Sequence, residues 1–253
     1  NLYPSNISGE DTEQVTQLLI NKYPSHSIAY RSLTWALNPK LMRNLEAQGY
    51  ILIPSRQVYL YDINLRDFRR KRDYKRDQKL RHNTEYTYVS QDDILDSDIP
   101  RIIELYNKLY LEKYSVHNPQ FSESYIRMAI KNEHFYIEGY RNHEGVLDAV
   151  GGSFSIGNLC SLPLVGYDTG KPINHGLYRL IIASAMKQAY DKNQLVNASS
   201  GAPKFKLLRG AKAEIEYTAI YVDHLPSNVK RMWRVIHYLL QKVAVPITEK
   251  YQL

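Results

Sequence analysis

Cysteine occurs only once in the 253 residues, at position 160. A single thiol excludes a disulfide within the chain, and the even-numbered cysteine framework of many secreted domains is missing. We therefore expect a cytoplasmic protein. No residue near Cys160 in the sequence has the character of an activating base, so we interpret it as a small core residue rather than a nucleophile.

Long hydrophobic runs are also missing. The best apolar stretch, 180–185, has six residues, whereas a helix that crosses a bilayer needs about 18. No membrane span is therefore predicted. The eight histidines show no paired spacing with acids or with the cysteine, and such pairing is typical of zinc sites. We therefore expect no metal.

Phenylalanine is scarce, with 5 residues, whereas tyrosine is abundant, with 22. Tyrosine rings suit half-wet clefts as well as cores, so this bias favours a groove without identifying a ligand. The 43% hydrophobic and 23% charged content is typical of a globular protein. The length allows one large domain or two small ones.

The net charge of +7 is concentrated in one segment. Residues 66–81 contain nine basic and three acidic side chains, hence +6, which leaves +1 for all other residues. Because 65–80 contains no proline or glycine, we predict a helix there, and its polarity on all sides predicts an exposed or bridging helix. The alternative is a surface for a polyanion such as tRNA, a coenzyme A phosphate or a nucleotide-linked acceptor.

Alternating and periodic apolar residues divide the remaining chain into strands and helices. Residues 50–53 and 57–62 are predicted to be paired strands joined by a turn at 54–56. Further strands are expected at 134–139, 146–156, 160–167, 194–199 and 214–222. Helices are expected at 39–47, 101–114, 122–132, 176–192 and from Ser227 onward. The predicted fold class is therefore mixed α/β.

The segment 195–211 carries the most information about function. A short apolar run at 195–196 gives way to small residues, and Pro203 suits the first turn of a new helix. That helix start carries Lys204, Lys206 and Arg209. A strand that leads into a cationic helix start can hold an anionic ligand or a developing oxyanion.

With its surroundings, this segment resembles the acyltransferase half of the GNAT superfamily, and more narrowly the FemAB peptidyltransferases and CelD-like acetyltransferases. Three motifs carry the resemblance: Gly166-Tyr-Asp168, Gly176-Leu-Tyr178 and Phe205-Lys206 shortly before Gly210. The match covers roughly residues 66–225. It implies a GNAT-like central mixed sheet flanked by helices. The implied organisation is a truncated GNAT-like portion (1–64), a basic connecting helix (65–82) and a GNAT-like acyltransferase domain (83–253).

The resemblance implies an N-acyltransferase that moves an acyl group from a thioester, with acyl-CoA or acetyl-CoA as the expected donor. The expected acceptor is the amine of a small or sugar- or nucleotide-linked molecule. The usual pyrophosphate loop of the superfamily is Gln/Arg-x-x-Gly-x-Gly/Ala, but here 171–176 has one glycine. The alternatives are an aminoacyl-tRNA-dependent FemAB-like peptidyltransferase, a carrier-protein thioester donor, and a catalytically inactive GNAT-like binding module.

The resemblance also implies roles for individual residues. Lys206 is expected to stabilise the tetrahedral intermediate, with a solvated surface lysine as the alternative. Tyr167 and Asp168 are expected to hold the acceptor amine, with Asp168 as the base, and a turn-forming aspartate is the alternative.

Strands that part at 160–167 and 194–199 are expected to offer backbone N–H groups to the donor. The residues expected to bind the donor are His175, Gly176, Tyr178, Ser199, Ser200 and Lys204. A plain loop histidine and small serines that pack a turn are the competing interpretations. Glu214 and Glu216 share one strand face with Thr218, which we interpret as a solvated polar face.

Overall fold

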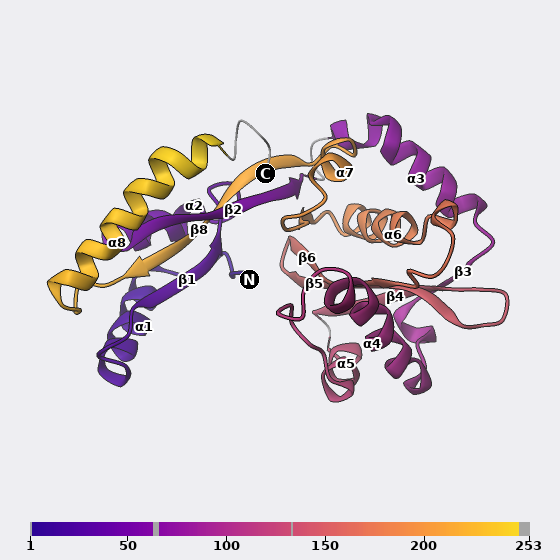
Figure 1. The fold of residues 1–253 in the computed structure, drawn as a ribbon, viewed down its shortest axis with the longest axis horizontal. Helices are drawn as coiled ribbons and strands as arrows, with labels where there is room; N and C mark the ends of the chain where they lie inside the picture. The colour runs from indigo at the N-terminus through magenta and orange to yellow at the C-terminus, as the bar shows by residue number, and fades with distance from the viewer. Residues whose placement is uncertain (1, 63–65, 133, 248–253) are drawn as a thin grey trace. The chain divides into compact units, whose positions relative to one another are not determined.

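The strands and helices gather in two units, each with its own core, in a computed structural model of the chain (Figure 1). The structure describes residues 2–62, 66–132 and 134–247. Unit 1 comprises Asn1–Leu60, Ser199–Leu207 and Lys212–Leu253. Unit 2 comprises Tyr61–Ala198 and Leu208–Ala211. The chain therefore passes from unit 1 into unit 2 and back twice.

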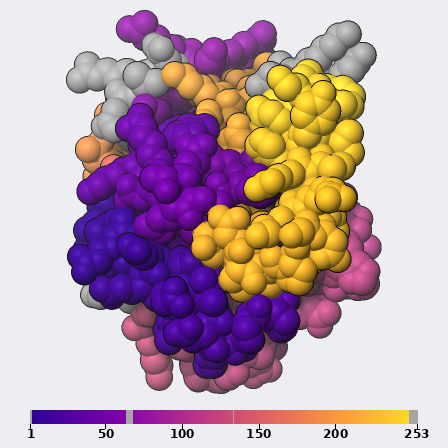
Figure 2. Space-filling view, turned by 90° about the vertical axis from the view of Figure 1, so that its left-hand side faces the viewer, coloured from indigo at the N-terminus to yellow at the C-terminus, as the bar shows by residue number. Residues whose placement is uncertain are grey.

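Unit 1 is built on three antiparallel strands in the order β1 (Ile28–Leu33), β8 (Lys212–Tyr221) and β2 (Ile51–Tyr61). Helices α1 (Gly9–Lys22) and α2 (Pro39–Ala47) cover one face, where Met42 and Leu45 pack against Leu52. Helix α8 (Ser227–Leu239) covers the other face through Trp233 and its neighbours. The yellow C-terminal helix lies beside the indigo and purple N-terminal segments in Figure 2. The short helix α7 (Pro203–Leu207) completes this unit.

The two strands predicted at 50–53 and 57–62 form the single strand β2, so the turn predicted at 54–56 is wrong. Strand β2 pairs with β8 along its length, and only the register shifts, between Pro54 and Arg56. A proline cannot donate to the ladder, and a bulge accommodates it without ending the strand. The Pro-Ser-Arg sequence therefore marks an irregularity in the backbone, but the pairing with β8 makes it a bulge within one strand and not a turn between two.

Unit 2 is built on five strands in the order β7 (Leu195–Asn197), β6 (Leu159–Tyr167), β5 (Leu147–Ile156), β4 (Phe135–Arg141) and β3 (Thr87–Val89). Strands β6 and β7 are parallel and the other neighbours are antiparallel, so the sheet is mixed. The predicted hairpin of β5 and β6 is confirmed. Gly157 adopts a φ of +58° in its turn, a region that glycine occupies at little cost.

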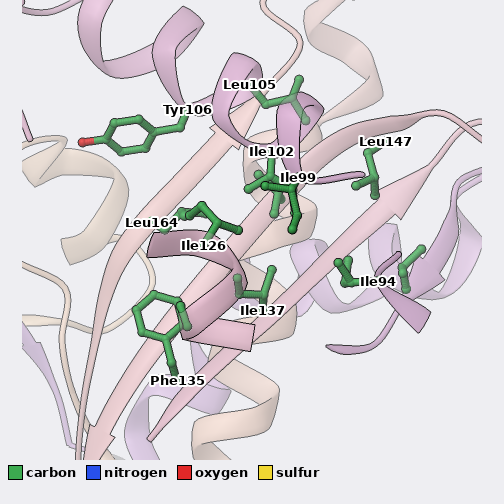
Figure 3. Close-up of a cluster of buried hydrophobic side chains, with 13 residues drawn as sticks. Ile94, Ile99, Ile102, Leu105, Tyr106, Ile126, Phe135, Ile137, Leu147 and Leu164 are labelled. Carbon is green, nitrogen blue, oxygen red and sulfur yellow. The ribbon is translucent and has the colours of Figure 1, made fainter. Parts of the chain in front are cut away.

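Helices cover both faces of the unit 2 strands. Helix α6 (Leu177–Asp191) packs one face, where Leu180 and Ile181 contact Val165. Helices α4 (Ile99–Asn107) and α5 (Glu123–Ile130) pack the other face, and Figure 3 shows the resulting isoleucine-rich core. A π-helical turn, Lys108–Glu112, continues α4. The predicted helix 176–192 is confirmed almost to the residue.

The basic segment does not form the single helix predicted for 65–80. A 3-10 helix, Arg66–Arg70, comes first, and α3 (Arg72–Asn83) follows. Leu65 lies outside the described residues. The break follows Phe68, which is only 2% exposed and lies so close to Gly210 that a Cβ there would meet it at 2.8 Å. Burial of this one ring therefore redirects a segment whose composition is otherwise polar.

Four short elements complete the described chain. They are 3-10 helices at Gln91–Asp93, Asp96–Asp98 and Ile173–His175, and a π-helical turn at Leu240–Ala244. Within the described residues, no helix has both the length and the apolar character needed to cross a membrane.

Candidate functional site

Strands β6 and β7 run together for only a short distance. They pair from Leu159 opposite Leu195 to Ser161 opposite Asn197. Strand β7 then ends, whereas β6 continues to Tyr167. The observed pairing agrees with the parting of strands that the resemblance implies, and β6 extends six residues beyond Ser161, the last residue that it pairs with β7.

A loop with unusual backbone angles follows β7 in the chain. Ser199 has a φ of +60°, Gly201 +80° and Ala202 +46°. Left-handed angles at residues other than glycine cost about 1–2 kcal/mol each and persist where the surroundings hold them. Here the Ser199 carbonyl accepts a hydrogen bond from the Tyr59 backbone N–H at 3.1 Å. The loop is therefore fixed from outside, by β2 of the same unit.

Lys206 secures this loop from α7. Its side chain is buried and donates hydrogen bonds to the carbonyl oxygens of Ser199, at 3.1 Å, and of Ser200, at 2.8 Å. The ammonium also lies 5.4 Å from the centre of the Tyr59 ring. The alternative, a solvated surface lysine, does not fit this buried position. Three of the predicted residues thus lie together in unit 1.

Burial, and secondly the charge of Arg56, lowers the pKa of Lys206 to about 8. Desolvation disfavours the charged form, and a neighbouring cation acts in the same direction. A lysine with this pKa is an ammonium at neutral pH and gives up its proton more readily than an exposed lysine does. It can stabilise an oxyanion, and it can also protonate a leaving group.

An ion pair beside this loop escaped the sequence analysis. Arg56 donates to both carboxylate oxygens of Glu216, at 2.8 and 3.3 Å, and to the Ser200 hydroxyl at 3.3 Å. Glu216 is buried, so the interpretation of its strand face as solvated is wrong at this position. The alternation of charged residues in β8 marked the face correctly, but the partner that covers it lies 160 positions earlier.

Asp168 follows β6 in unit 2 and is held by cations. Arg101 donates to one of its carboxylate oxygens at 2.9 Å, and the Gly170 N–H donates to the other at 3.0 Å. Lys108 lies 3.5 Å away. Burial opposes the charge, but the hydrogen bonds from Arg101 and Gly170 and the charge of Lys108 outweigh it and lower the pKa of Asp168. These partners favour a positioning role, and the role of base stays a prediction.

The remaining residues predicted in unit 2 lie around the start of α6. Gly176 precedes the helix with a φ of +67°, and a Cβ there would meet Leu80 of α3 at 2.7 Å. His175 shares a 2.8 Å hydrogen bond with the Tyr86 hydroxyl. The rings of Tyr167 and Tyr178 are in tilted contact at 6.1 Å, and burial raises the pKa of Tyr178.

Two further predictions have simple outcomes. Lys204 lies on α7 and is exposed, so its side chain does not join the contacts of Lys206 with the loop. Cys160 is buried, which confirms its interpretation as a core residue, and burial raises the pKa of its thiol. Within the described residues, no group of three or more His, Cys, Asp or Glu side chains is arranged to hold a metal ion.

The sequence analysis missed a buried carboxylate in the basic helix. Asp77 of α3 is 2% exposed and accepts hydrogen bonds from Arg179 of α6 at 2.6 Å and from Arg209 at 2.5 Å. In the sequence, Asp77 is simply one of the three acidic residues in a segment that also contains nine basic residues. Its spacing gave no signal, because both partners are more than 100 positions away.

A second buried acid, Glu138 of β4, was also missed. It is 3% exposed and accepts a hydrogen bond from the Tyr88 hydroxyl at 2.8 Å. Burial raises its pKa to about 7, although the Tyr88 hydrogen bond and the charges of Arg81 and Lys192 act in the opposite direction. The group therefore changes charge near neutral pH, where an ordinary glutamate does not.

Glu138→Gln should make stability less dependent on pH. The folded pKa is raised above the ordinary 4.5, so the stabilising contribution of Glu138 is complete below that value and is lost as pH rises through about 7. From about pH 5 to about pH 8, the unfolding free energy of the wild type should fall by about 1–3 kcal/mol relative to the variant. Urea denaturation at both pH values measures this difference. Glu144→Gln, at an exposed turn residue, is the control, and parallel pH dependences of wild type and E138Q would contradict the prediction.

Comparisons with known proteins were informative only at the level of structure. No protein-family model and no curated protein matches the sequence. FemX matches with a TM-score of 0.63 and 10% identity, over 91% of this chain and 81% of that chain. The C-terminal domain of a protein described as a lysylphosphatidylglycerol synthetase, from Agrobacterium fabrum, gives 0.61 and 11% over 92% and 79%. L-PGS from Bacillus licheniformis gives 0.60 and 14% over 90% and 78%.

At these identities the likeness concerns the fold alone. The predicted mixed α/β fold class, a central mixed sheet flanked by helices, is confirmed, and these three structures share that fold. The branch, the truncated GNAT-like portion (1–64) and the domain boundaries predicted from the sequence stay predictions.

Proposed function

We propose that this protein is an acyltransferase that moves an aminoacyl group from an activated ester on tRNA to a nucleophilic acceptor. The observation that carries the proposal is Lys206, a buried ammonium with a lowered pKa on the carbonyls of a strained loop. Attack on the donor carbonyl generates an oxyanion, and a fixed cation in a water-poor position stabilises that charge.

The proposed reaction balances without a further reactant. The acceptor amine forms a bond to the donor carbonyl carbon, and the ester bond to the ribose oxygen breaks. The amine loses a proton and the ribose oxygen gains one. Lys206 would stabilise the negative charge that forms on the carbonyl oxygen. The resemblance assigns the orientation of the acceptor to Tyr167 and Asp168 of unit 2, and this assignment stays a prediction.

Three observations support an aminoacyl ester as the donor. The sequence resembles the FemAB branch, and some enzymes of that branch use aminoacyl-tRNA. Structures with the same fold include FemX and a protein whose name denotes the joining of a lysyl group to phosphatidylglycerol. The loop before α6 has one glycine instead of the usual set, and Leu80 of α3 packs against that glycine.

The second candidate is the N-acyltransferase with acyl-CoA or acetyl-CoA as the donor. The short pairing of β6 with β7 favours it, because a pantetheine chain can occupy the edge that β7 leaves. Under this candidate, the residues predicted to contact the coenzyme are His175, Gly176, Tyr178, Ser199, Ser200 and Lys204. The inactive binding module is the third candidate, and it predicts no turnover with either donor.

Parallel transfer assays test these candidates. The purified protein is incubated with a pool of radiolabelled aminoacyl-tRNAs and, separately, with a panel of acyl-CoAs, each with and without amine acceptors. Acceptor-dependent loss of the aminoacyl group supports the main proposal, and thiol release supports the second candidate. Failure of both donors would overturn the proposed activity and favour the binding module.

A further inference from the structure

A hollow of about 640 Å³ opens between α3 and the first turn of α6, entirely within unit 2. Its walls come from α3, from Arg179 of α6 and from Arg209. The lining residues are Asp73, Arg76, Asp77, Lys79, Leu80, Asn83, Arg179 and Arg209.

The walls carry an excess of positive charge. Four of the lining side chains are cations and two are carboxylates, which leaves a charge of +2. Asp77 accepts from both arginines, so one buried negative charge serves two guanidinium groups. Arg179 uses its Nε for this contact, and among the described residues no acceptor occupies its two terminal nitrogens.

The two cations of α3 are available to a ligand. Arg76 has one distant ion pair, at 3.7 Å from Asp73, and both Arg76 and Lys79 are exposed. In the part of the chain that the structure describes, Lys79 has no ion pair. Because residues three and four apart share a helix face, Arg76, Lys79 and Asn83 line the hollow together. Asn83 adds an uncharged amide donor.

We propose that this hollow binds a phosphate ester. Guanidinium groups and lysine are the side chains that recognise phosphate oxygens, through paired N–H donors and through charge. No aromatic side chain belongs to the lining, so the site has no platform on which a nucleobase could stack. A volume of about 640 Å³ exceeds the needs of a lone phosphate and suits a phosphate with an attached organic group.

The inference rests in part on the proposed function, because both donors named above carry phosphate esters. In that case the donor phosphate binds to side chains of α3, Arg179 and Arg209. The backbone of the single-glycine loop before α6 would then not need to bind the phosphate. Binding is measured without turnover, so the two proposals can fail separately.

Binding of phosphate-bearing probes to the full chain tests the proposal. The probes are coenzyme A, and a short RNA stem with a single-stranded CCA end, each titrated against wild type by calorimetry or fluorescence anisotropy. The test variant is Arg76→Ala with Lys79→Ala. The control is Arg72→Ala with Lys75→Ala, which removes the same charge from exposed positions of the same helix outside the lining.

We expect the test variant to raise the Kd of the bound probe by at least about tenfold, and the control by no more than about threefold. For RNA, the slope of log Kd against log salt should also fall by about 2 in the test variant. Binding of coenzyme A alone identifies a coenzyme phosphate, and binding of RNA alone identifies the nucleic acid backbone.

Two outcomes would overturn the proposal. In one, neither probe binds the wild type more tightly than about 1 mM, the weak end of specific affinity. In the other, the test and control variants weaken binding equally, which means that general charge and not the hollow attracts the probe. If the protein binds the probe in this way but transfers nothing, the phosphate site is supported and the proposed function is overturned. If the test variant still transfers with an unchanged donor KM, the proposed function is supported and the phosphate site is overturned.

Discussion

Replacement of Lys206 by methionine is expected to lower the rate of acyl transfer by about 100- to 1,000-fold, the usual effect of removing one oxyanion-stabilising donor. Methionine retains a long unbranched side chain but removes the ammonium that now donates to the carbonyls of Ser199 and Ser200. The Ser199 carbonyl keeps its hydrogen bond from the Tyr59 backbone N–H, so the main cost falls on the Ser200 carbonyl, about 1–3 kcal/mol if water does not replace the ammonium. Single-turnover rates with the active donor, together with thermal melts, measure the two effects separately.

Lys204→Met is the matched control for this experiment. Lys204 belongs to the same helix α7 and is exposed, so its loss changes the net charge equally without touching the loop. With aminoacyl-tRNA as the donor, we expect its transfer rate to stay within about threefold of the wild type, because only the coenzyme A candidate assigns Lys204 a contact. If both variants are equally active, Lys206 has a purely structural role and the proposed mechanism is wrong.

The pH dependence gives a second view of Lys206. Its pKa is about 8, whereas an ordinary lysine has 10.5. If the ammonium is the active form, the rate should fall as pH rises through about 8. Stability should move in the other direction, because between about 8 and 10.5 the unfolded chain binds more protons than the folded one. A rate that falls while the protein becomes more stable therefore reports the chemistry and not unfolding.

Asp77→Asn is expected to lower the unfolding free energy by about 3 kcal/mol. The substitution preserves the shape of the side chain but removes the charge that neutralises Arg179 and Arg209. Removal of one partner of a buried ion pair costs about 3–5 kcal/mol. The lower end applies here because the Arg179 side chain is 38% exposed. Urea denaturation, with the midpoint and slope fitted separately, measures the loss.

The control for this substitution lies one helical turn earlier. Asp73 is 25% exposed, and its ion pairs with Arg76 and Arg209 are long, at 3.7 and 3.9 Å. Asp73→Asn should therefore cost less than about 1 kcal/mol. Equal losses for the two aspartates would mean that the charge of Asp77 contributes no more than a surface charge does.

Local patterns in the sequence were sufficient for the regular elements of unit 2. The hairpin of β5 and β6 and the helix α6 lie close to their predicted bounds, because alternation, turn glycines and helical periodicity are properties of neighbouring residues. The small-residue motif before Pro203 likewise led to Lys206. The motif did not reveal that the ammonium is buried or that it donates to carbonyls of the loop before α7.

The predicted secondary structure was wrong where contacts with residues distant in the sequence determine the backbone conformation. The single strand β2 depends on pairing with β8, and the break before α3 depends on Phe68 under Gly210. In both cases a contact with a distant segment outweighs the local preference, for a turn at 54–56 and for a continuous helix at 65–80. Neither pairing partner can be identified from neighbouring residues, since sheet register is set by the whole buried face.

The sequence by itself determined the mixed α/β elements, the single basic segment and the motif that contains Lys206. Only the tertiary structure decided which charges are buried and paired. Arg56 meets Glu216 across 160 positions, and Asp77 meets Arg209 across 132. The reason is physical: the cost of burying a charge depends on what surrounds it in space, and the folded chain, not the order of residues, fixes those surroundings.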